Sequence, residues 1–186
     1  IDKDPTVSLP IPYGRLIDPI ARRNRKATVQ AILELIETSR KMRNGFDREL
    51  LTFEAVCLLV AGQPDKAAKT LQQLTTRDKT DGWLFALQGM AWERAKDAKL
   101  AAMAAERAVK LLPGRSGPLL LLARIKIARK QTADGIKLAE RSMAIHPRRW
   151  STRRLLRDAY RKAGDLPKAR RMEALLKRIG KEKPGP

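Results

Sequence analysis

The sequence predicts an all-α fold, a right-handed α-solenoid built from antiparallel pairs of helices. The 186 residues are 43% hydrophobic but only 4% aromatic, with Ala and Leu prominent among them, and this composition favours helices over strands. The chain also repeats itself with a period of 34 residues. Each copy contains two amphipathic segments of about 13 residues on either side of a short polar turn, which is the pattern of stacked helical hairpins.

The period is clearest in the turns, where a shift of 34 residues superposes four short segments that each place a turn before a small residue. These segments are 62–67, 96–101, 130–135 and 164–169. The same shift carries Pro113 onto Pro147 and relates three small residues: Ala55, Gly89 and Ala123. Small residues allow two helix axes to approach closely, and the prolines end the second helices because proline cannot donate the next hydrogen bond.

These features resemble the tetratricopeptide repeat (TPR) family, whose 34-residue repeat carries Trp-x2-Leu-Gly-x2-Tyr, then Ala, then Pro. In the second copy Gly89 matches the small residue of the first helix, Trp92 the following aromatic residue and Pro113 the closing proline. In the last copy Tyr160 takes the aromatic position. The sequence departs from the pattern at five positions. Leu58 and Lys126 replace the aromatic residue, Arg157 replaces a small residue, and Lys79 and Lys181 replace the closing proline.

The resemblance predicts how the chain is organised. Its length suits one domain, and we expect four repeats, each of two helices, at 48–81, 82–115, 116–149 and 150–181. Residues 15–47 are expected to form an N-terminal helical cap or a degenerate half-repeat, with helices near 16–23 and 27–42. The proline-rich stretch 1–14 is expected to be an extended arm, and 182–186 a disordered tail.

The chain is strongly basic. It has 40 Lys and Arg against 20 Asp and Glu, a formal charge of +20. The surplus is greatest at the C-terminal end, because residues 141–186 contain 15 basic and 4 acidic residues. A potential of this size attracts acidic proteins, polyanions or anionic lipid.

Signatures of catalysis and of metal binding are missing from the sequence. There is no Gly-rich phosphate loop and no zinc-binding His pair, because His146 is the only histidine. We therefore expect no enzyme activity, no catalytic or metal-binding residues, no cofactor and no small-molecule substrate. Cys57 is interpreted as a buried small hydrophobe, and His146 as solvent-facing or locally bonded. Trp83 and Trp150 stay candidates for stacking on a base or a sugar.

In TPR proteins the first helices of the hairpins line a concave groove, and the resemblance implies where that groove lies here. The predicted partner-binding positions are Phe53, Leu87, Leu120, Leu121, Arg124, Arg154, Leu155 and Arg161. They are apolar in the first repeats and become basic in the last. Either they hold a peptide or helix with acidic residues, or Phe53 and Leu87 simply pack against neighbouring helices or the arm.

Some TPR proteins bind the C-terminal carboxylate of heat-shock chaperones through Lys, Asn and Arg at fixed groove positions. Three of those positions are occupied here by Thr52, Val56 and Leu87, so the resemblance argues against that ligand class.

Two functions remain after these exclusions. The first is a scaffold that holds a partner protein through an acidic or amphipathic segment, in a bacterial envelope, secretion or polysaccharide-export assembly as in similar bacterial TPR proteins. The alternative is binding of a polyanion (nucleic acid, acidic polysaccharide or anionic lipid) by a basic patch: Arg148, Arg149, Arg153, Arg157, Lys162, Arg170 and Arg171. No apolar run approaches the roughly 18 residues of a membrane span. Self-association and the compartment, periplasm or cytoplasm, stay open.

Overall fold

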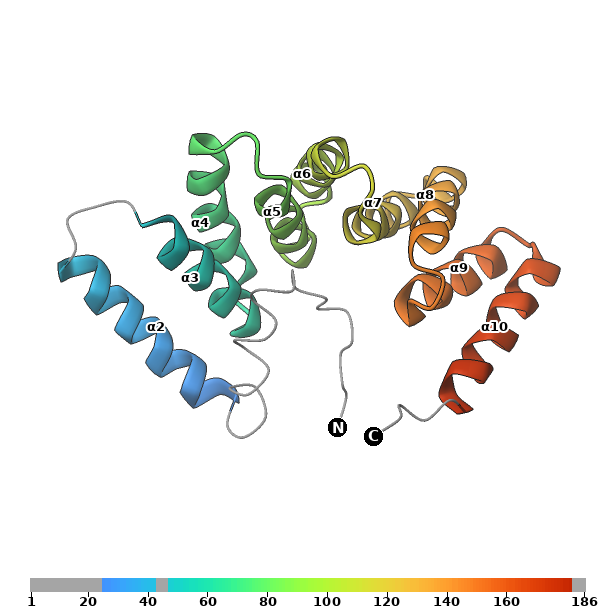
Figure 1. Cartoon of the computed structure of the whole chain (residues 1–186), viewed down its shortest axis with the longest axis horizontal. Helices are drawn as coiled ribbons and strands as arrows, with labels where there is room; N and C mark the ends of the chain where they lie inside the picture. Colours follow the sequence, from blue (N-terminus) through green and yellow to red (C-terminus); the bar gives the residue numbers. More distant parts are fainter. Residues whose placement is uncertain (1–24, 43–46, 182–186) are drawn as a thin grey trace. The chain divides into compact units, whose positions relative to one another are not determined.

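The structure is a computed structural model that describes residues 25–42 and 47–181 (Figure 1). Within these ranges the chain forms nine α-helices and no strand. They are α2 (Arg25–Met42), α3 (Arg48–Val60), α4 (Pro64–Arg77), α5 (Gly82–Arg94), α6 (Ala98–Leu111), α7 (Ser116–Ala128), α8 (Thr132–Ile145), α9 (Trp150–Lys162) and α10 (Leu166–Lys181). The predicted arm at 1–14, the helix expected near 16–23 and the tail at 182–186 lie outside the described residues.

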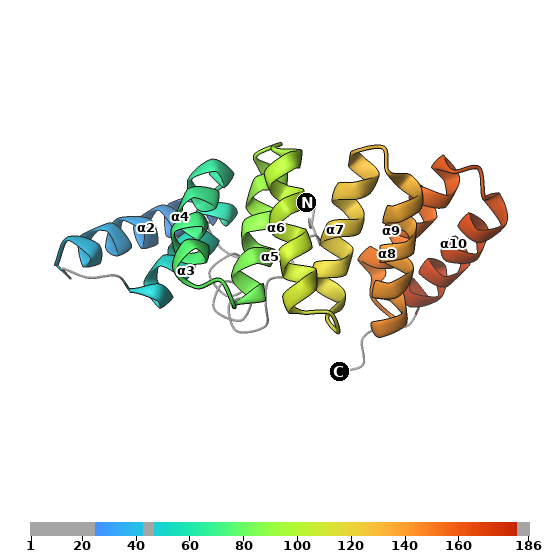
Figure 2. The same cartoon turned by 90° about the horizontal axis from the view of Figure 1, so that it is seen from above.

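Eight of the described helices form hairpins, in which consecutive helices lie side by side (Figure 1, Figure 2). The pairs are α3 with α4, α5 with α6, α7 with α8, and α9 with α10. Each pair is joined by a short turn (61–63, 95–97, 129–131 or 163–165), so its helices run antiparallel. The predicted all-α fold of antiparallel helix pairs is confirmed.

The turn inside each hairpin places one residue in the left-handed region. The φ angle is 75° at Gly62, 64° at Lys96 and Lys130, and 79° at Gly164. The N–H of the next residue then donates back to the carbonyl five positions earlier, at Leu58, Trp92, Lys126 or Tyr160, over 2.9 or 3.0 Å. This bond satisfies a carbonyl at the end of the first helix and stops that helix at the same point in every repeat.

Contacts divide the described helices into two compact units. The N-terminal unit contains α2 to α6, and the C-terminal unit contains α7 to α10, with the boundary between Leu111 and Leu112. Such a grouping suits a repeat protein, because each hairpin packs mainly on its neighbours.

The N-terminal unit has a core cluster of leucine, alanine and valine from α3, α4 and α5, and α6 adds buried alanines such as Ala101 and Ala105. Leu71, Leu74 and Leu87 are almost completely buried in this core. Helix α2 contacts α3, and its Leu33 packs against the same core, whereas Leu35 on α2 is exposed. None of the described helices is long and apolar enough to cross a membrane.

The C-terminal unit has its own core, in which Ala123, Leu156, Tyr160 and Met172 pack together. The Tyr160 hydroxyl donates to a Glu140 carboxylate oxygen over 2.6 Å. Burial, followed by this hydrogen bond, raises the pKa of Tyr160 well above its ordinary value. An aromatic side chain on α9 thus spans to α8, the second helix of the preceding hairpin.

Candidate partner-binding surface

Helices α7 and α9 are the first helices of the two hairpins in the C-terminal unit, and they contact each other. The described residues at the predicted groove positions here are Leu120, Leu121 and Arg124 on α7, and Arg154, Leu155 and Arg161 on α9. Leu121 is only 4% exposed and belongs to the packed interior. Leu120, Arg124 and Leu155 are half-buried, and Arg154 and Arg161 are exposed. The two helices therefore offer leucine edges and arginine side chains to a ligand.

The exposed face of α9 carries an aromatic and two basic side chains at helical spacing. These are Trp150, Arg154 and Arg161, which we call the α9 row. The guanidinium carbon of Arg154 lies 5.1 Å from the centroid of the Trp150 ring, a cation–π arrangement that restricts the arginine side chain. Trp150 itself is 38% exposed, so the open part of its ring can still contact another molecule.

Two further arginines of α9, Arg157 and Arg161, are paired with acidic side chains. Arg161 Nη2 lies 2.7 Å from Glu173 Oε2 of α10, with both side chains partly exposed. Arg157 bonds to Asp158 on its own helix, 2.8 Å from Nε to Oδ1. That hydrogen bond is the main reason why the pKa of Arg157 is raised. A ligand carboxylate that binds Arg161 would join Glu173 in an extended ion pair. A ligand carboxylate that binds Arg157 would have to displace Asp158.

The predicted basic patch divides into structural and exposed members. Arg149 is half-buried and donates to Ser116 Oγ over 3.1 Å, and burial lowers its pKa. Arg153 donates to the carbonyls of Pro147, at 2.9 Å, and Leu175, at 3.1 Å. Together with Arg157, these arginines bind within their own unit. The exposed members are Arg148, Lys162, Arg170 and Arg171.

The predicted groove positions of the N-terminal unit lie closer to the packed interior. Leu87 on α5 is 1% exposed and belongs to the core cluster, so in this structure its surface contacts the protein itself. Phe53 on α3 is half-buried. Of the two alternatives drawn from the sequence, packing against neighbouring helices describes Leu87, and Phe53 keeps some surface for a ligand.

Comparison with known proteins identifies the fold but no close relative. No protein-family model matches the chain, and no curated protein matches it by sequence. Solved structures do match. A crystal structure of MamA is 18% identical, covers 84% of this chain and 92% of its own, and has a TM-score of 0.75. MamA from Desulfovibrio magneticus RS-1, residues 41 to the end, is 16% identical over 93% of this chain and 98% of its own, with a TM-score of 0.76.

A third solved structure carries the repeat name. The first TPR of Spaghetti (RPAP3), bound to the HSP90 peptide SRMEEVD, is 17% identical, covers 63% of this chain and 93% of its own, and has a TM-score of 0.61. The chain has the TPR fold. At these identities the likeness concerns the fold alone, and it gives no ligand to this chain.

The residues at the TPR carboxylate-clamp positions are buried here. Thr52 is almost completely buried, and its hydroxyl donates to the Arg48 carbonyl over 2.7 Å. Val56 and Leu87 lie in the core. These three positions therefore hold neutral, buried side chains in place of the Lys, Asn and Arg of the clamp.

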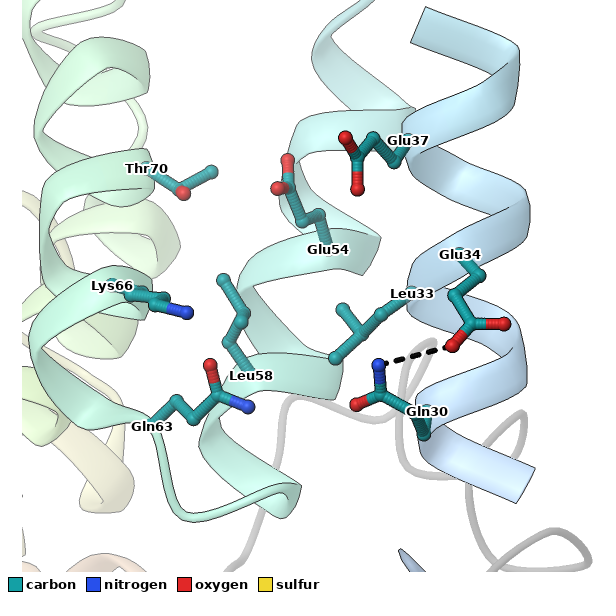
Figure 3. Close-up of a pocket in the computed structure, with 9 residues that line it drawn as sticks. All are labelled: Gln30, Leu33, Glu34, Glu37, Glu54, Leu58, Gln63, Lys66 and Thr70. Carbon is teal, nitrogen blue, oxygen red and sulfur yellow. Dashed lines mark hydrogen bonds between the residues drawn. The ribbon is translucent and has the colours of Figure 1, made fainter. Parts of the chain in front are cut away.

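Sequence reasoning missed a pocket of about 670 Å³ in the N-terminal unit, lined by residues of α2, α3 and α4 (Figure 3). The lining includes Leu33 and Leu58, three carboxylates and one amine: Glu34, Glu37, Glu54 and Lys66. A signal for it was present, because Leu58 stands at the TPR aromatic position and is smaller than the residue that the repeat pattern places there.

Chemically reactive side chains are scarce in the part of the chain that the structure describes. No cluster of His, Cys, Asp and Glu suited to a metal ion occurs there. His146 is exposed at the end of α8. Cys57 is buried, which confirms its interpretation as a small core residue. Burial, together with the charge of Glu54, raises the pKa of the Cys57 thiol from 9.0 to about 11.

Alkaline pH is expected to destabilise the N-terminal unit through Cys57. Since the folded-state pKa is raised, the thiol contributes its full stability below the unfolded value of 9.0, and this contribution falls as pH rises toward about 11. We expect the urea midpoint to fall from about pH 8 to about pH 10.5 less steeply in Cys57→Ala than in the unaltered protein. Equal slopes in the two proteins would contradict this assignment.

Proposed function

We propose that this chain is a non-enzymatic scaffold that holds a segment of a partner protein on the surface of α7 and α9. The observation that carries the proposal is the α9 row, an exposed Trp150, Arg154 and Arg161 on a helix that also carries the half-buried Leu155 and that contacts α7, where Leu120 is half-buried. Aromatic and arginine side chains next to an apolar floor are the residues that dominate protein interfaces. The solved RPAP3 structure shows that hairpins of this fold hold a peptide in another protein.

The chemistry of the surface selects an acidic, amphipathic segment. Carboxylates of the partner would pair with Arg154 and Arg161, and with Arg124 on α7, through charge-assisted hydrogen bonds. Apolar side chains of the partner would cover the exposed part of Trp150 and the edges of Leu120 and Leu155. Leu121, which is 4% exposed, would support α7 from within.

A pair of synthetic peptides tests this proposal. One peptide is a helix former with glutamates and with leucine at every third or fourth position, and the control peptide replaces each leucine by serine at unchanged charge. Measured by fluorescence anisotropy at about 0.15 M salt, the first peptide is expected to bind the full chain about tenfold more tightly or better. Equal affinity for both peptides would mean that the apolar side chains do not contribute to binding, and it would contradict the proposal.

Polyanion binding is the second candidate, and the charge distribution favours it. Residues 112–181 contain 20 Lys and Arg against 5 Asp and Glu, whereas residues 25–111 contain 15 against 11. The exposed members of the basic patch would contact phosphate or sulfate groups without sequence preference. If the chain binds polyanions, we expect it to bind heparin or single-stranded DNA. The logarithm of that affinity should fall steeply and linearly as the logarithm of the salt concentration rises. No binding at low salt would exclude it.

A further inference from the structure

The two arginines of the α9 row have a defined spacing. Arg154 and Arg161 are seven residues apart, which is close to two turns of an α-helix and a distance of roughly 10 Å along its axis. Seven residues also bring a helix back to within about 20° of the same direction. Both exposed side chains therefore lie on one side of α9, whereas Leu156, on the opposite side, is buried.

Neighbouring side chains hold both guanidinium groups in place. The guanidinium carbon of Arg154 lies 5.1 Å from the centroid of the Trp150 ring, and Arg161 Nη2 lies 2.7 Å from Glu173 Oε2. An aromatic ring stacks on the flat face of a guanidinium rather than on its N–H groups, and one carboxylate occupies only some of the five N–H groups. Each arginine can therefore bind a further carboxylate, at a separation that these contacts restrict.

The position between the two arginines does not favour an acidic group. Asp158 lies four residues after Arg154 and three before Arg161, on the same exposed face. Its charge is balanced by Arg157, whose Nη2 lies 2.8 Å from Asp158 Oδ1. A ligand carboxylate opposite Asp158 would face a like charge and would have to compete for Arg157. The surface thus favours two acidic groups with a neutral residue between them.

The distance between the arginines selects the secondary structure of the ligand. Residues on one face of an extended strand are two or four positions apart, which corresponds to roughly 7 or 13 Å. Neither distance matches the roughly 10 Å between two positions seven apart on α9. A helical ligand matches both the distance and the direction, because its own residues seven positions apart lie two turns apart on one face.

We propose that the partner segment is an α-helix that lies along α9 and carries two acidic residues seven positions apart, one bound to Arg154 and the other to Arg161. This inference rests on the proposed function and specifies the segment that α7 and α9 hold. Charge complementarity argues for this occupant. Leu155 directly follows Arg154 and is half-buried, about 100° further around α9, so leucines on the adjacent side of the ligand helix would contact it.

Two peptides of identical composition test the spacing. Both are Ala-rich helix formers of about 20 residues with the same leucines and two glutamates. The glutamates are seven positions apart in one peptide, and exchanging one of them with a glutamine places them five apart in the other. Five positions turn a helix by about 140° beyond a full turn, so only one glutamate can then face α9. By fluorescence anisotropy with the full chain at about 0.15 M salt, we expect the first peptide to bind about tenfold more tightly.

Single variants show which arginines read the spacing. Arg154→Gln and Arg161→Gln are each expected to bring the ratio of the two affinities to about one, because one guanidinium cannot sense where the second glutamate lies. The control Arg141→Gln removes the same charge from an exposed position of α8 and should preserve the ratio. Circular dichroism checks that every variant keeps its helices and that the two peptides are equally helical.

The outcomes separate this inference from the proposed function. The inference is overturned if the unaltered chain binds both acidic peptides equally, or if the preference survives in Arg154→Gln and Arg161→Gln. In either case the proposed function stands as long as the leucine-containing peptide binds more tightly than its serine counterpart. If neither acidic peptide binds the chain, both the inference and the proposed function fail.

Discussion

Replacing Gly135 with alanine is expected to destabilise the C-terminal unit by about 1 to 3 kcal/mol, the usual cost of overpacking. A Cβ atom at this position of α8 would lie 2.4 Å from Ile127 Cγ1 and 2.8 Å from the Ala123 carbonyl oxygen. The carbonyl belongs to the backbone of α7, so the clash can be relieved only by moving the two helices apart. The loss outweighs the gain of up to about 1 kcal/mol that alanine offers over glycine inside a helix.

Gly117→Ala is the matched control. It lies on α7 of the same unit, and a Cβ there would have only Arg149 Nη1 near it, at 3.9 Å, an ordinary contact. Thermal unfolding followed by circular dichroism is expected to show a lower melting temperature for Gly135→Ala and an equal or higher one for Gly117→Ala. A Gly135→Ala protein as stable as the unaltered chain would mean that α7 and α8 are not as close as described.

The lack of space at Gly135 could not be inferred from the sequence. The repeat pattern identifies the position as one for a small residue, since the register relates Gly135 to Ala67, Ala101 and Ala169. By the repeat pattern alone, alanine fits this position. Only the distance between α7 and α8 in this hairpin, which depends on Ile127 and on the backbone of α7, reveals that the third repeat has no room for a methyl group.

The fold class was predictable because it depends on local and repeated features. Turn residues, small residues and closing prolines recur at one spacing, and each acts on its own neighbourhood. The division into two units was not predictable in the same way, because it depends on how well one hairpin packs on the next. The sequence gives no direct measure of that packing.

For the candidate site, the sequence supplies a set of residues but not the interactions of their side chains. The register places Arg153, Arg154 and Arg157 within five residues on one helix. A count of charged residues does not distinguish between these three arginines. In the structure Arg153 binds two backbone carbonyls, Arg157 binds Asp158, and Arg154 stacks on Trp150. Their hydrogen-bond partners come from tertiary contacts, which the 34-residue period does not specify.

Reversing two charges of the α9 row is expected to weaken binding of the acidic leucine-containing peptide by roughly 10- to 100-fold. In the variant Arg154→Glu with Arg161→Glu, both side chains are exposed, so the change acts on the surface rather than on the core. Arg161→Glu also faces Glu173, its present partner at 2.7 Å, and a small fall in melting temperature is expected from that repulsion. Anisotropy titration measures the affinity, and circular dichroism checks that the helices remain.

The variant Arg170→Glu with Arg171→Glu makes the same change in charge on exposed positions of α10, and it decides between the two proposed functions. A partner segment held on α7 and α9 depends on the α9 row, so the α10 variant should lose about threefold at most through the weaker overall potential. A polyanion that senses the summed charge of the C-terminal unit would lose affinity to a similar extent with either variant. Equal losses for the peptide would place its contacts outside the α9 row and would favour the polyanion function.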